Sequence, residues 1–247
     1  MFTVALIGPD GAGKTTIATM LEASQGGRIR YVYMGDNLQT SNVMLPTTRL
    51  LRTLEQRSLE QRRTASAERD AAGDSERGNG QPLRPIGLRA RSLSLAKWAL
   101  CYANWLAEEY YRDLVAWWLL KRGHVVVFDR HFFLDYYADD IAGSAKGRSL
   151  SRRLHALMLD WAHPRPDLVV FLDAPAQLLF ARKGEFSVEH LERRRQDYFS
   201  LRSVFPHFAV VDASQPPEAV MRDVLGCISD YRTQVCEGRG ERLRATG

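Results

Sequence analysis

The stretch that decides the fold is GPDGAGKT at residues 8–15, which matches the pattern G-x-x-x-x-G-K-[ST] at every fixed position. Residues 2–7 (FTVALI) precede it and are apolar enough for a buried strand, and residues 16–22 (TIATMLE) favour a helix. A strand, a glycine-rich bend and a helix, in this order, direct backbone N–H groups and the positive end of a helix dipole toward a phosphate. The stretch therefore predicts a loop that binds a nucleoside triphosphate.

The side chains of this loop have separate expected roles. Gly8, Gly11 and Gly13 allow the backbone to bend so that its N–H groups converge on phosphate oxygens. We expect Lys14 to reach the β- and γ-phosphates, and the hydroxyl of Thr15 to ligate Mg²⁺. A glycine-rich turn that binds nothing is the alternative, and the flanking strand and helix patterns argue against it.

Composition limits the remaining choices. The 247 residues, 45% of them hydrophobic, are enough for one sizeable α/β domain with an appendage. A net charge of +5 suits small anionic ligands as well as nucleic acid, and we expect no nucleic-acid partner. The three cysteines lack metal-binding spacing and fit a reducing compartment. No apolar run reaches about 18 residues, and a strand from residue 2 leaves no room for a signal peptide, so we expect a cytoplasmic protein without a membrane span.

Apolar runs typical of strands alternate with helical patterns along the whole chain. Further strands are expected at 28–34, 124–130, 168–173 and 208–212, and helices at 93–120, 149–161, 176–182, 187–204 and 217–231. This alternation predicts a mostly parallel sheet covered on both faces, with ligands at the carboxyl ends of the strands.

Two segments lack the apolar residues that an ordered core needs. Residues 56–91 are rich in Arg, Ser, Ala, Gly and Glu, which predicts a flexible basic insertion; a flap over an anionic substrate is the functional alternative. Residues 233–247 are interpreted as a disordered basic tail. We expect a single domain over residues 1–232.

The expected helix at 93–120 carries an aromatic stripe. Trp98, Tyr102 and Trp105 fall at spacings of three and four, with Glu109 and Arg112 continuing the same face. Such a stripe is usually core, but two charged residues are unusual on a buried face. The other interpretation is a pocket wall in which the three aromatic residues stack on a flat substrate.

Asp129 and Arg130 end the expected strand at 124–130, at the sheet edge where the loop should lie. A carboxylate at that position can hold Mg²⁺ through water or orient an attacking oxygen, and a guanidinium can clamp a substrate phosphate through two hydrogen bonds. A surface ion pair between the two side chains is the alternative.

An ordered set of segments resembles the thymidylate kinases. It consists of VALIGPDGAGKTT at 4–16, GHVVVFDRH at 123–131, LDAP at 172–175, RKGEF at 182–186 followed by LERRRQDY at 191–198, and VDAS at 211–214. With Pro217, Glu218 and Val220 after it, the last segment is similar to the loop that holds adenine in that family. The loop motif alone is shared by many proteins, whereas the ordered set is much more specific. The resemblance covers roughly residues 2–34 and 100–231.

The resemblance implies a P-loop NTPase fold of three layers, with a five-stranded parallel sheet and a helical lid at 182–196. It implies ATP and Mg²⁺ as cofactors, transfer of the γ-phosphoryl group to a nucleoside monophosphate such as dTMP, and leaves a homodimer open. The implied catalytic residues are Lys14, Asp129, Arg130 and Arg182, with Thr15 and Asp129 at the metal. The implied nucleotide-binding residues are Gly8, Asp10, Gly11, Ala12, Gly13, Lys14, Thr15, Thr16, Arg182, Lys183, Ala213 and Ser214. Trp98, Tyr102, Trp105 and Arg130 are the candidate substrate-binding residues.

The sequence departs from this family on the acceptor side. Residues 33–37 (YMGDN) stand where thymidylate kinases usually carry an acidic-Pro-Gly segment, and residues 102–109 (YANWLAEE) lack the family's Asp-Arg pair. The donor half therefore matches and the acceptor half does not. A kinase of a sugar, polyol or lipid-linked acceptor, with Asp129 as the base, and a non-enzymatic module switched by ATP remain alternatives.

Overall fold

The computed structural model describes residues 1–35, 41–50, 53, 57, 88–130 and 165–245. The chain forms two compact units, one made of Met1–Val43 with Asp113–Gly247 and the other of Met44–Arg112. The expected helix at 149–161 and most of the expected insertion at 56–91 fall outside the described residues. Among the described residues, no helix combines the length and the apolar character that crossing a membrane would require.

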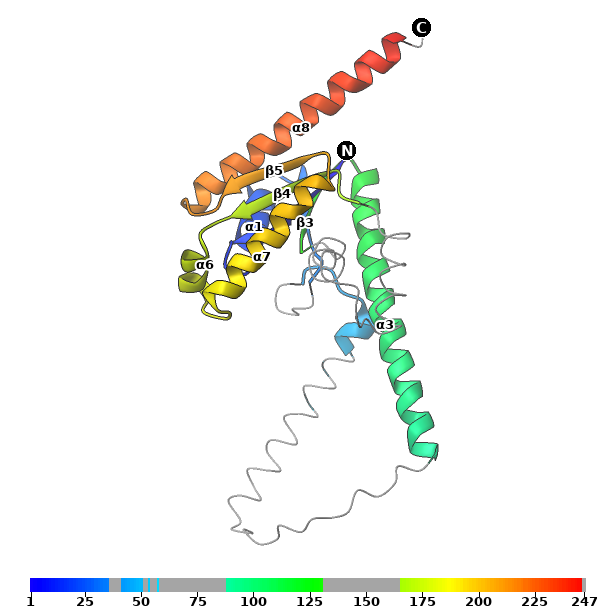
Figure 1. The fold of residues 1–247 in the computed structure, drawn as a ribbon. Coiled ribbons are helices and arrows are strands. Elements are labelled where there is room, and N and C mark those ends of the chain that lie inside the picture. Colours follow the sequence, from blue (N-terminus) through cyan, green and yellow to red (C-terminus); the bar gives the residue numbers. More distant parts are fainter. Residues whose placement is uncertain (36–40, 51–52, 54–56, 58–87, 131–164, 246–247) are drawn as a thin grey trace. The chain divides into compact units, whose positions relative to one another are not determined.

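A parallel sheet forms the centre of the first unit (Figure 1). Its strands are β1 (Thr3–Ile7), β2 (Ile29–Tyr33), β3 (Val125–Asp129), β4 (Leu168–Asp173) and β5 (Phe208–Asp212), in the order β2-β3-β1-β4-β5. Every neighbouring pair is parallel. Strands β1, β3 and β4 are almost entirely buried apolar runs rich in β-branched residues, as expected for central strands covered on both faces, whereas β5 at the edge of the sheet exposes Val210. The predicted five-stranded parallel α/β fold is confirmed.

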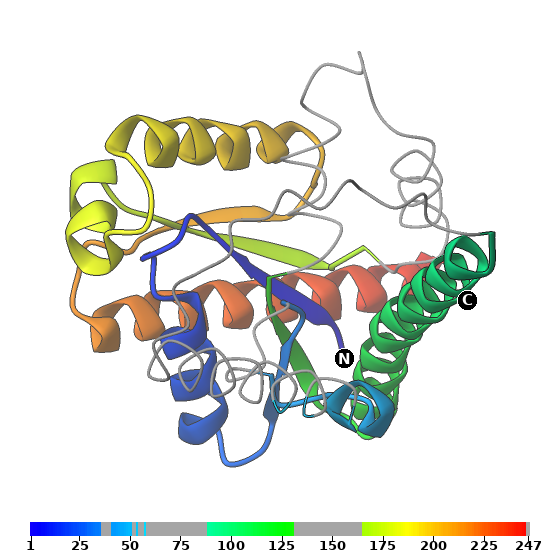
Figure 2. The ribbon, with the colours of Figure 1, turned by 90° about the horizontal axis from the view of Figure 1, so that it is seen from below.

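Helices cover both faces of this sheet (Figure 2). They are α1 (Lys14–Ser24), α3 (Leu88–Lys121), α6 (Ala176–Lys183), α7 (Val188–Ser200) and α8 (Pro217–Ala245). Val4 and Leu6 of β1 face α1 and α8, whereas Ala5 and Ile7 face α7, because successive side chains of a strand alternate between the two faces. The last turns of α3 cover the second face over β2 and β3, through Ala116 and Leu119.

The second unit pairs the amino-terminal part of α3 with a short helical stretch at residues 46–50. The carboxylate of Glu108 accepts hydrogen bonds from the backbone N–H of Leu45 (3.0 Å) and the hydroxyl of Thr48 (2.7 Å), and it pairs with Arg112 at 3.2 Å. Glu109 is also buried. Glu108, Glu109 and Arg112 are therefore part of the interior of the second unit.

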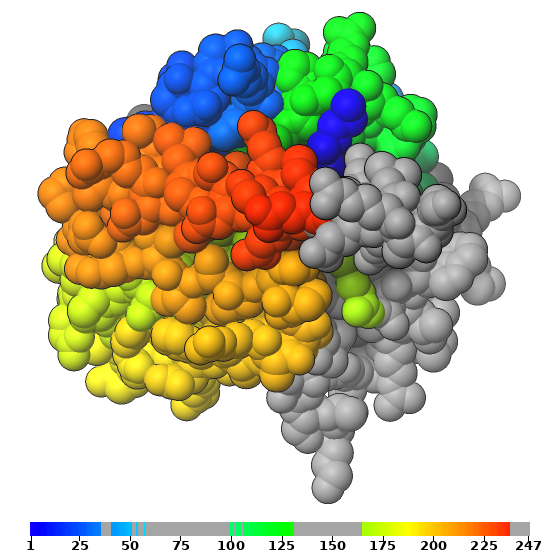
Figure 3. Space-filling model, turned by 90° about the horizontal axis from the view of Figure 1, so that it is seen from above, coloured from blue at the N-terminus to red at the C-terminus, as the bar shows by residue number. Residues whose placement is uncertain are grey.

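Two helix boundaries differ from the sequence-based expectation. Helix α3 begins at Leu88, inside the expected insertion, and α8 continues to Ala245, through most of the segment interpreted as a disordered tail. Residues 233–245 contain several good helix formers, and Gly238 and Gly240 weaken a helix by only about 1 kcal/mol each, so the helix can extend past Tyr231. The outer surface of α8 lies beside α1 in Figure 3.

Candidate active site

The loop between β1 and α1 has backbone angles that only glycine adopts without strain. Gly8, Gly11 and Gly13 have φ values of 149°, 89° and 86°. A Cβ atom at Gly8 would lie 2.6 Å from the carbonyl oxygen of Leu172, and one at Gly11 would lie 2.8 Å from that of Leu179. The glycines therefore allow the loop to pass close to β4 and α6.

Lys14, the first residue of α1, lies over this loop. Its ammonium group donates hydrogen bonds to the carbonyl oxygens of Gly8 (2.6 Å) and Pro9 (3.0 Å), and the side chain is only 8% exposed. A buried cation is thus fixed at the start of a helix, where the helix dipole is also positive. The arrangement can bind a polyanion.

Asp129 meets the first turn of α1. Residues Val125, Val127 and Asp129 share the sheet face that α1 covers, since side chains along β3 alternate. The hydroxyl of Thr15 donates a 2.5 Å hydrogen bond to Oδ2 of Asp129, whose side chain is fully buried. The carboxylate and the loop hydroxyl, which the sequence predicts as metal ligands, are therefore adjacent.

Arg130 follows directly and carries a positive φ of 61°, the only such value at a non-glycine residue in the described part of the chain. Its guanidinium group forms an ion pair and a hydrogen bond with Asp10 in the loop. A strained backbone of this kind persists where the surroundings fix it, and it is common at functional sites. The expected substrate clamp thus lies against the phosphate loop.

Asp10 is the acidic centre of a cationic cluster. Burial raises its pKa, but the positive charges of Lys14, Arg130 and Lys183 outweigh burial and hold the pKa below the ordinary value of 3.8. Lys183 lies 3.6 Å from the Asp10 carboxylate and 2.8 Å from that of Glu185. The hydrogen bond to Glu185, with Asp10 nearby, raises the pKa of Lys183. The cluster is therefore fully charged at neutral pH.

The expected lid begins at the end of α6, where Gly184 closes the helix in a left-handed conformation. Arg182 donates a 2.9 Å hydrogen bond to the carbonyl oxygen of Ala213, and its Nη1 lies 3.5 Å from the carbonyl oxygen of Gly11. Arg182 thus joins the phosphate loop to the turn after β5. The sequence does not predict that this side chain binds backbone carbonyls.

A cavity of about 420 Å³ lies beside Arg182. The predicted residues Gly11, Ala12, Gly13, Thr16 and Ala213 line it, as do Pro217 and Val220 from the segment that resembles the family's adenine loop. Ile17 and Gln215 also line the cavity, and the sequence reasoning missed these two. Ser214 does not line the cavity; its N–H and hydroxyl both bond Asp212, which lowers the pKa of that carboxyl group.

Asp173 and Arg195 form a second contact that the sequence reasoning missed. The guanidinium of Arg195, on α7, holds both carboxylate oxygens of Asp173, at the end of β4, at 2.7 and 2.9 Å. It also bonds Glu192, one turn earlier, at 2.7 Å. The spacing of three between Glu192 and Arg195 was the available signal. The pair fixes α7 to the sheet edge next to the phosphate loop.

The expected aromatic substrate wall lies in the other unit. Trp98, Tyr102 and Trp105 are on α3, where Tyr102 is half-buried and the side chains of the two tryptophans are outside the described residues. Their role in binding a substrate stays a prediction. In the first unit, by contrast, the structure brings together Lys14, Thr15, Asp129, Arg130 and Arg182.

The site therefore belongs to an α/β protein with a phosphate-binding loop. The chain is 33% identical over 117 residues to a probable thymidylate kinase of Thermococcus gammatolerans. The aligned part covers 44% of this chain and 53% of that protein, so the chain spans about half the length of the curated relative that it matches. No family model matches the chain. The similarity supports a thymidylate kinase-like family, in agreement with the sequence motifs.

Proposed function

We propose that the protein is a phosphotransferase of the thymidylate kinase type, which moves the γ-phosphoryl group of ATP to a nucleoside monophosphate, dTMP or a related one. The observation that carries the proposal is the meeting of two chain segments. The end of β3 supplies Asp129, which bonds Thr15, and Arg130, which bonds Asp10. A protein that only binds Mg-triphosphate can also use such a carboxylate, but it has no need for an acceptor-side guanidinium at this position.

The residues present fit ATP. The glycine bends and Lys14 suit the phosphates, and the 420 Å³ cavity suits a purine base, because its wall is mostly apolar with Gln215 and the Ala213 turn as polar groups. Space is also open at Gly13, where an added Cβ would meet nothing within 4 Å. On this assignment Arg182 lies between the base cavity and the phosphate loop.

The residues also fit Mg²⁺. Thr15 and Asp129 present a hydroxyl and a carboxylate, the oxygen ligands that this ion prefers, and Mg²⁺ is usually bound by one or two protein groups with phosphate oxygens and water. When bound, the ion would neutralise charge on the triphosphate. No cluster of three or more His, Cys, Asp or Glu side chains suited to a metal occurs among the described residues, so a closed all-protein metal site is not what the chain offers there.

The chain's own cations would supply the remaining stabilisation. Phosphoryl transfer depends chiefly on positioning and on stabilising the charge that spreads over the equatorial oxygens. Asp10 is surrounded by Lys14, Arg130 and Lys183. A phosphate that binds there would replace the Asp10 carboxylate as the anionic partner of these cations. Fixed positive groups need little reorganisation when charge develops. Arg130 would then hold the acceptor phosphate while Lys14 holds the donor.

A second candidate is a kinase of a non-nucleotide acceptor. The observation that favours it is that Glu108 on α3 already has its partners: it pairs with Arg112 and accepts hydrogen bonds from Leu45 and Thr48. Thymidylate kinases place an Asp-Arg pair on the corresponding helix, and this chain has none. In this case Asp129 would take the proton of an acceptor hydroxyl.

A screen of Mg-ATP consumption against the nucleoside monophosphates tests the proposal. We expect turnover with at least one base, and none with a Lys14→Ala variant, whose loop lacks the phosphate-binding cation. No signal over the whole set, with turnover of a sugar or polyol instead, would establish the second candidate. If ATP binds tightly but no acceptor is turned over, the protein is a non-enzymatic module switched by ATP.

A further inference from the structure

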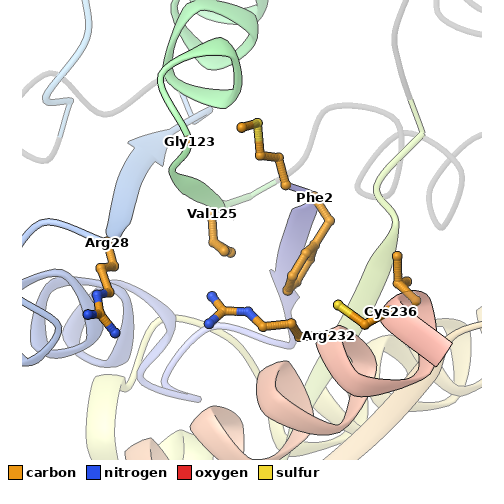
Figure 4. A pocket seen from close by; sticks show the side chains of 8 residues that line it. Phe2, Arg28, Gly123, Val125, Arg232 and Cys236 are labelled. Carbon is orange, nitrogen blue, oxygen red and sulfur yellow. The ribbon is translucent and has the colours of Figure 1, made fainter. Parts of the chain in front are cut away.

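The first unit has a second cavity, of about 420 Å³, at the amino ends of the strands. Phe2 and Val125, at the starts of β1 and β3, form its apolar floor, and Arg232 and Cys236 of α8 form one wall (Figure 4). Arg28, just before β2, lies across from Arg232. Because β1 is a strand of five residues, roughly 15 Å of sheet separates this cavity from the phosphate loop.

Buried contacts fix the walls of this cavity. The backbone N–H of Val125 donates to the carbonyl oxygen of Arg28 at 3.0 Å, which joins the starts of β2 and β3. Tyr231 of α8 packs edge-on against the ring of Phe2, with centroids 4.9 Å apart, and is buried. Arg232 and Cys236 follow on α8 at a spacing of four, so they share one helix face. The hollow is therefore a property of the packed unit.

The charged side chains that line this cavity are arginines, and in the part of the chain that the structure describes no carboxylate lines it. Arg28 and Arg232 both line it and both are exposed, and no carboxylate of the described residues pairs with either at salt-bridge distance. A guanidinium group binds carboxylate or phosphate through two parallel hydrogen bonds. Two guanidinium groups above an apolar floor complement a molecule that has an anionic end and an apolar body. The volume of the cavity, about 420 Å³, lies within the range of small-molecule sites.

We propose that this cavity is a second ligand site that binds a small soluble organic anion, a phosphate monoester or a carboxylate with an apolar body, through Arg28 and Arg232. The apolar body lies on Phe2 and Val125. The site is separate from the phosphate loop, and the proposal does not depend on which acceptor the protein uses.

Cys236 provides a local readout, because it is exposed within the cavity wall. A chain with Cys101→Ser and Cys227→Ser keeps it as the only thiol. We expect hexyl phosphate to slow the reaction of Cys236 with the neutral reagent N-ethylmaleimide by about fivefold or more, since the bound anion would cover the wall. Inorganic phosphate, which lacks the apolar body, should protect less.

Arginine variants decide between this site and a nonspecific effect. Arg28→Ala with Arg232→Ala should raise the hexyl phosphate concentration needed for protection by about tenfold or more, because two charge-assisted contacts are lost. Arg222→Ala, another exposed arginine of α8, should change it less than about twofold. Circular dichroism checks that α8 is retained. Equal protection in the double variant and the control overturns the proposal, and so does protection only by phosphatidic acid vesicles.

Discussion

The hydroxyl of Thr15 donates a 2.5 Å hydrogen bond to Oδ2 of Asp129, a residue 114 positions later in the chain. The contact joins the first turn of α1 to the carboxyl end of β3. Since Asp129 is fully buried, its charge depends on the few donors and cations around it. The hydroxyl therefore has two expected effects, one on the stability of the first unit and one on the chemistry of the site.

Replacing Thr15 separates the hydroxyl from the shape of the side chain. Thr15→Val keeps the shape but removes a donor to a buried carboxylate, which should lower the free energy of unfolding by about 1–3 kcal/mol. Turnover should fall roughly a hundredfold, with a greater need for Mg²⁺. Thr15→Ser keeps the hydroxyl and should stay near wild type in urea unfolding and in the acceptor assay. Equal behaviour of the two variants would show that the hydroxyl has no role.

Arg130 should respond differently to alanine and to glycine. Both substitutions remove the guanidinium and should lower turnover by about a hundredfold or more, equivalent to roughly 3 kcal/mol of transition-state stabilisation. Glycine adopts a φ of 61° without the left-handed penalty of about 1–2 kcal/mol that alanine incurs. Arg130→Gly should therefore be more stable to urea than Arg130→Ala. A twofold effect on turnover would remove Arg130 from the site.

Arg182 should affect ATP binding more than folding. Arg182→Ala loses the contacts with Ala213 and with the loop, and we expect KM for ATP to rise about tenfold with a small change in urea midpoint. Arg193→Ala, an exposed arginine on α7, is the matched control and should leave KM unchanged. An equal rise of KM in both variants would show that the effect comes from a general loss of positive charge and not from the contacts of Arg182.

The ion pair between Asp173 and Arg195 should be measurable by a double-mutant cycle. Asp173→Asn and Arg195→Gln each break a partly buried two-bond contact, and the coupling in urea unfolding should be about 1–3 kcal/mol. The cycle of Asp173→Asn with Arg193→Gln should give a coupling close to zero. A near-zero value in both cycles would mean that the pair does not hold α7 to β4.

The contributions of Asp10 and Lys183 to the free energy of unfolding should stay constant over a wide pH range. The pKa of Asp10 is lowered, so its contribution is present above the ordinary value of 3.8 and is lost as the pH falls through the folded pKa. The pKa of Lys183 is raised, so its contribution is present below 10.5 and is lost as the pH rises through its folded value.

Asp10→Asn tests the acid side of this behaviour. In urea titrations at a series of pH values the variant should lose less stability than wild type as the pH falls below about 4, because no carboxylate at residue 10 takes up a proton. Asp197→Asn, on α7, is a control from outside the cluster. Parallel pH curves for wild type and Asp10→Asn would contradict the lowered pKa.

The sequence predicted the elements of the sheet because their signals are local. The runs at 168–173 and 208–212 contain enough β-branched and aromatic residues to define β4 and β5 without knowledge of their neighbours. The loop could be predicted for the same reason, since its glycine angles and its lysine lie within eight residues of sequence.

What the sequence could not provide was the pairing of distant side chains. Nothing in the pattern around Arg195 or Arg182 indicates that one holds Asp173 and the other the carbonyl oxygen of Ala213, because such contacts depend on how α6 and α7 pack. The end of α8 was also missed, because the residues after Tyr231 lack the apolar periodicity by which a helix is identified in sequence.

The parallel pairing of β1 with β3 fixes the position of Asp129 relative to the phosphate loop. Leu6 is the register partner of Asp129, and the loop starts two residues after Leu6. Inserting or deleting one residue within β3 would rotate Asp129 to the opposite side of the sheet, toward the side that α3 covers. A change in the length of this buried strand would therefore separate the carboxylate from the loop in a single step.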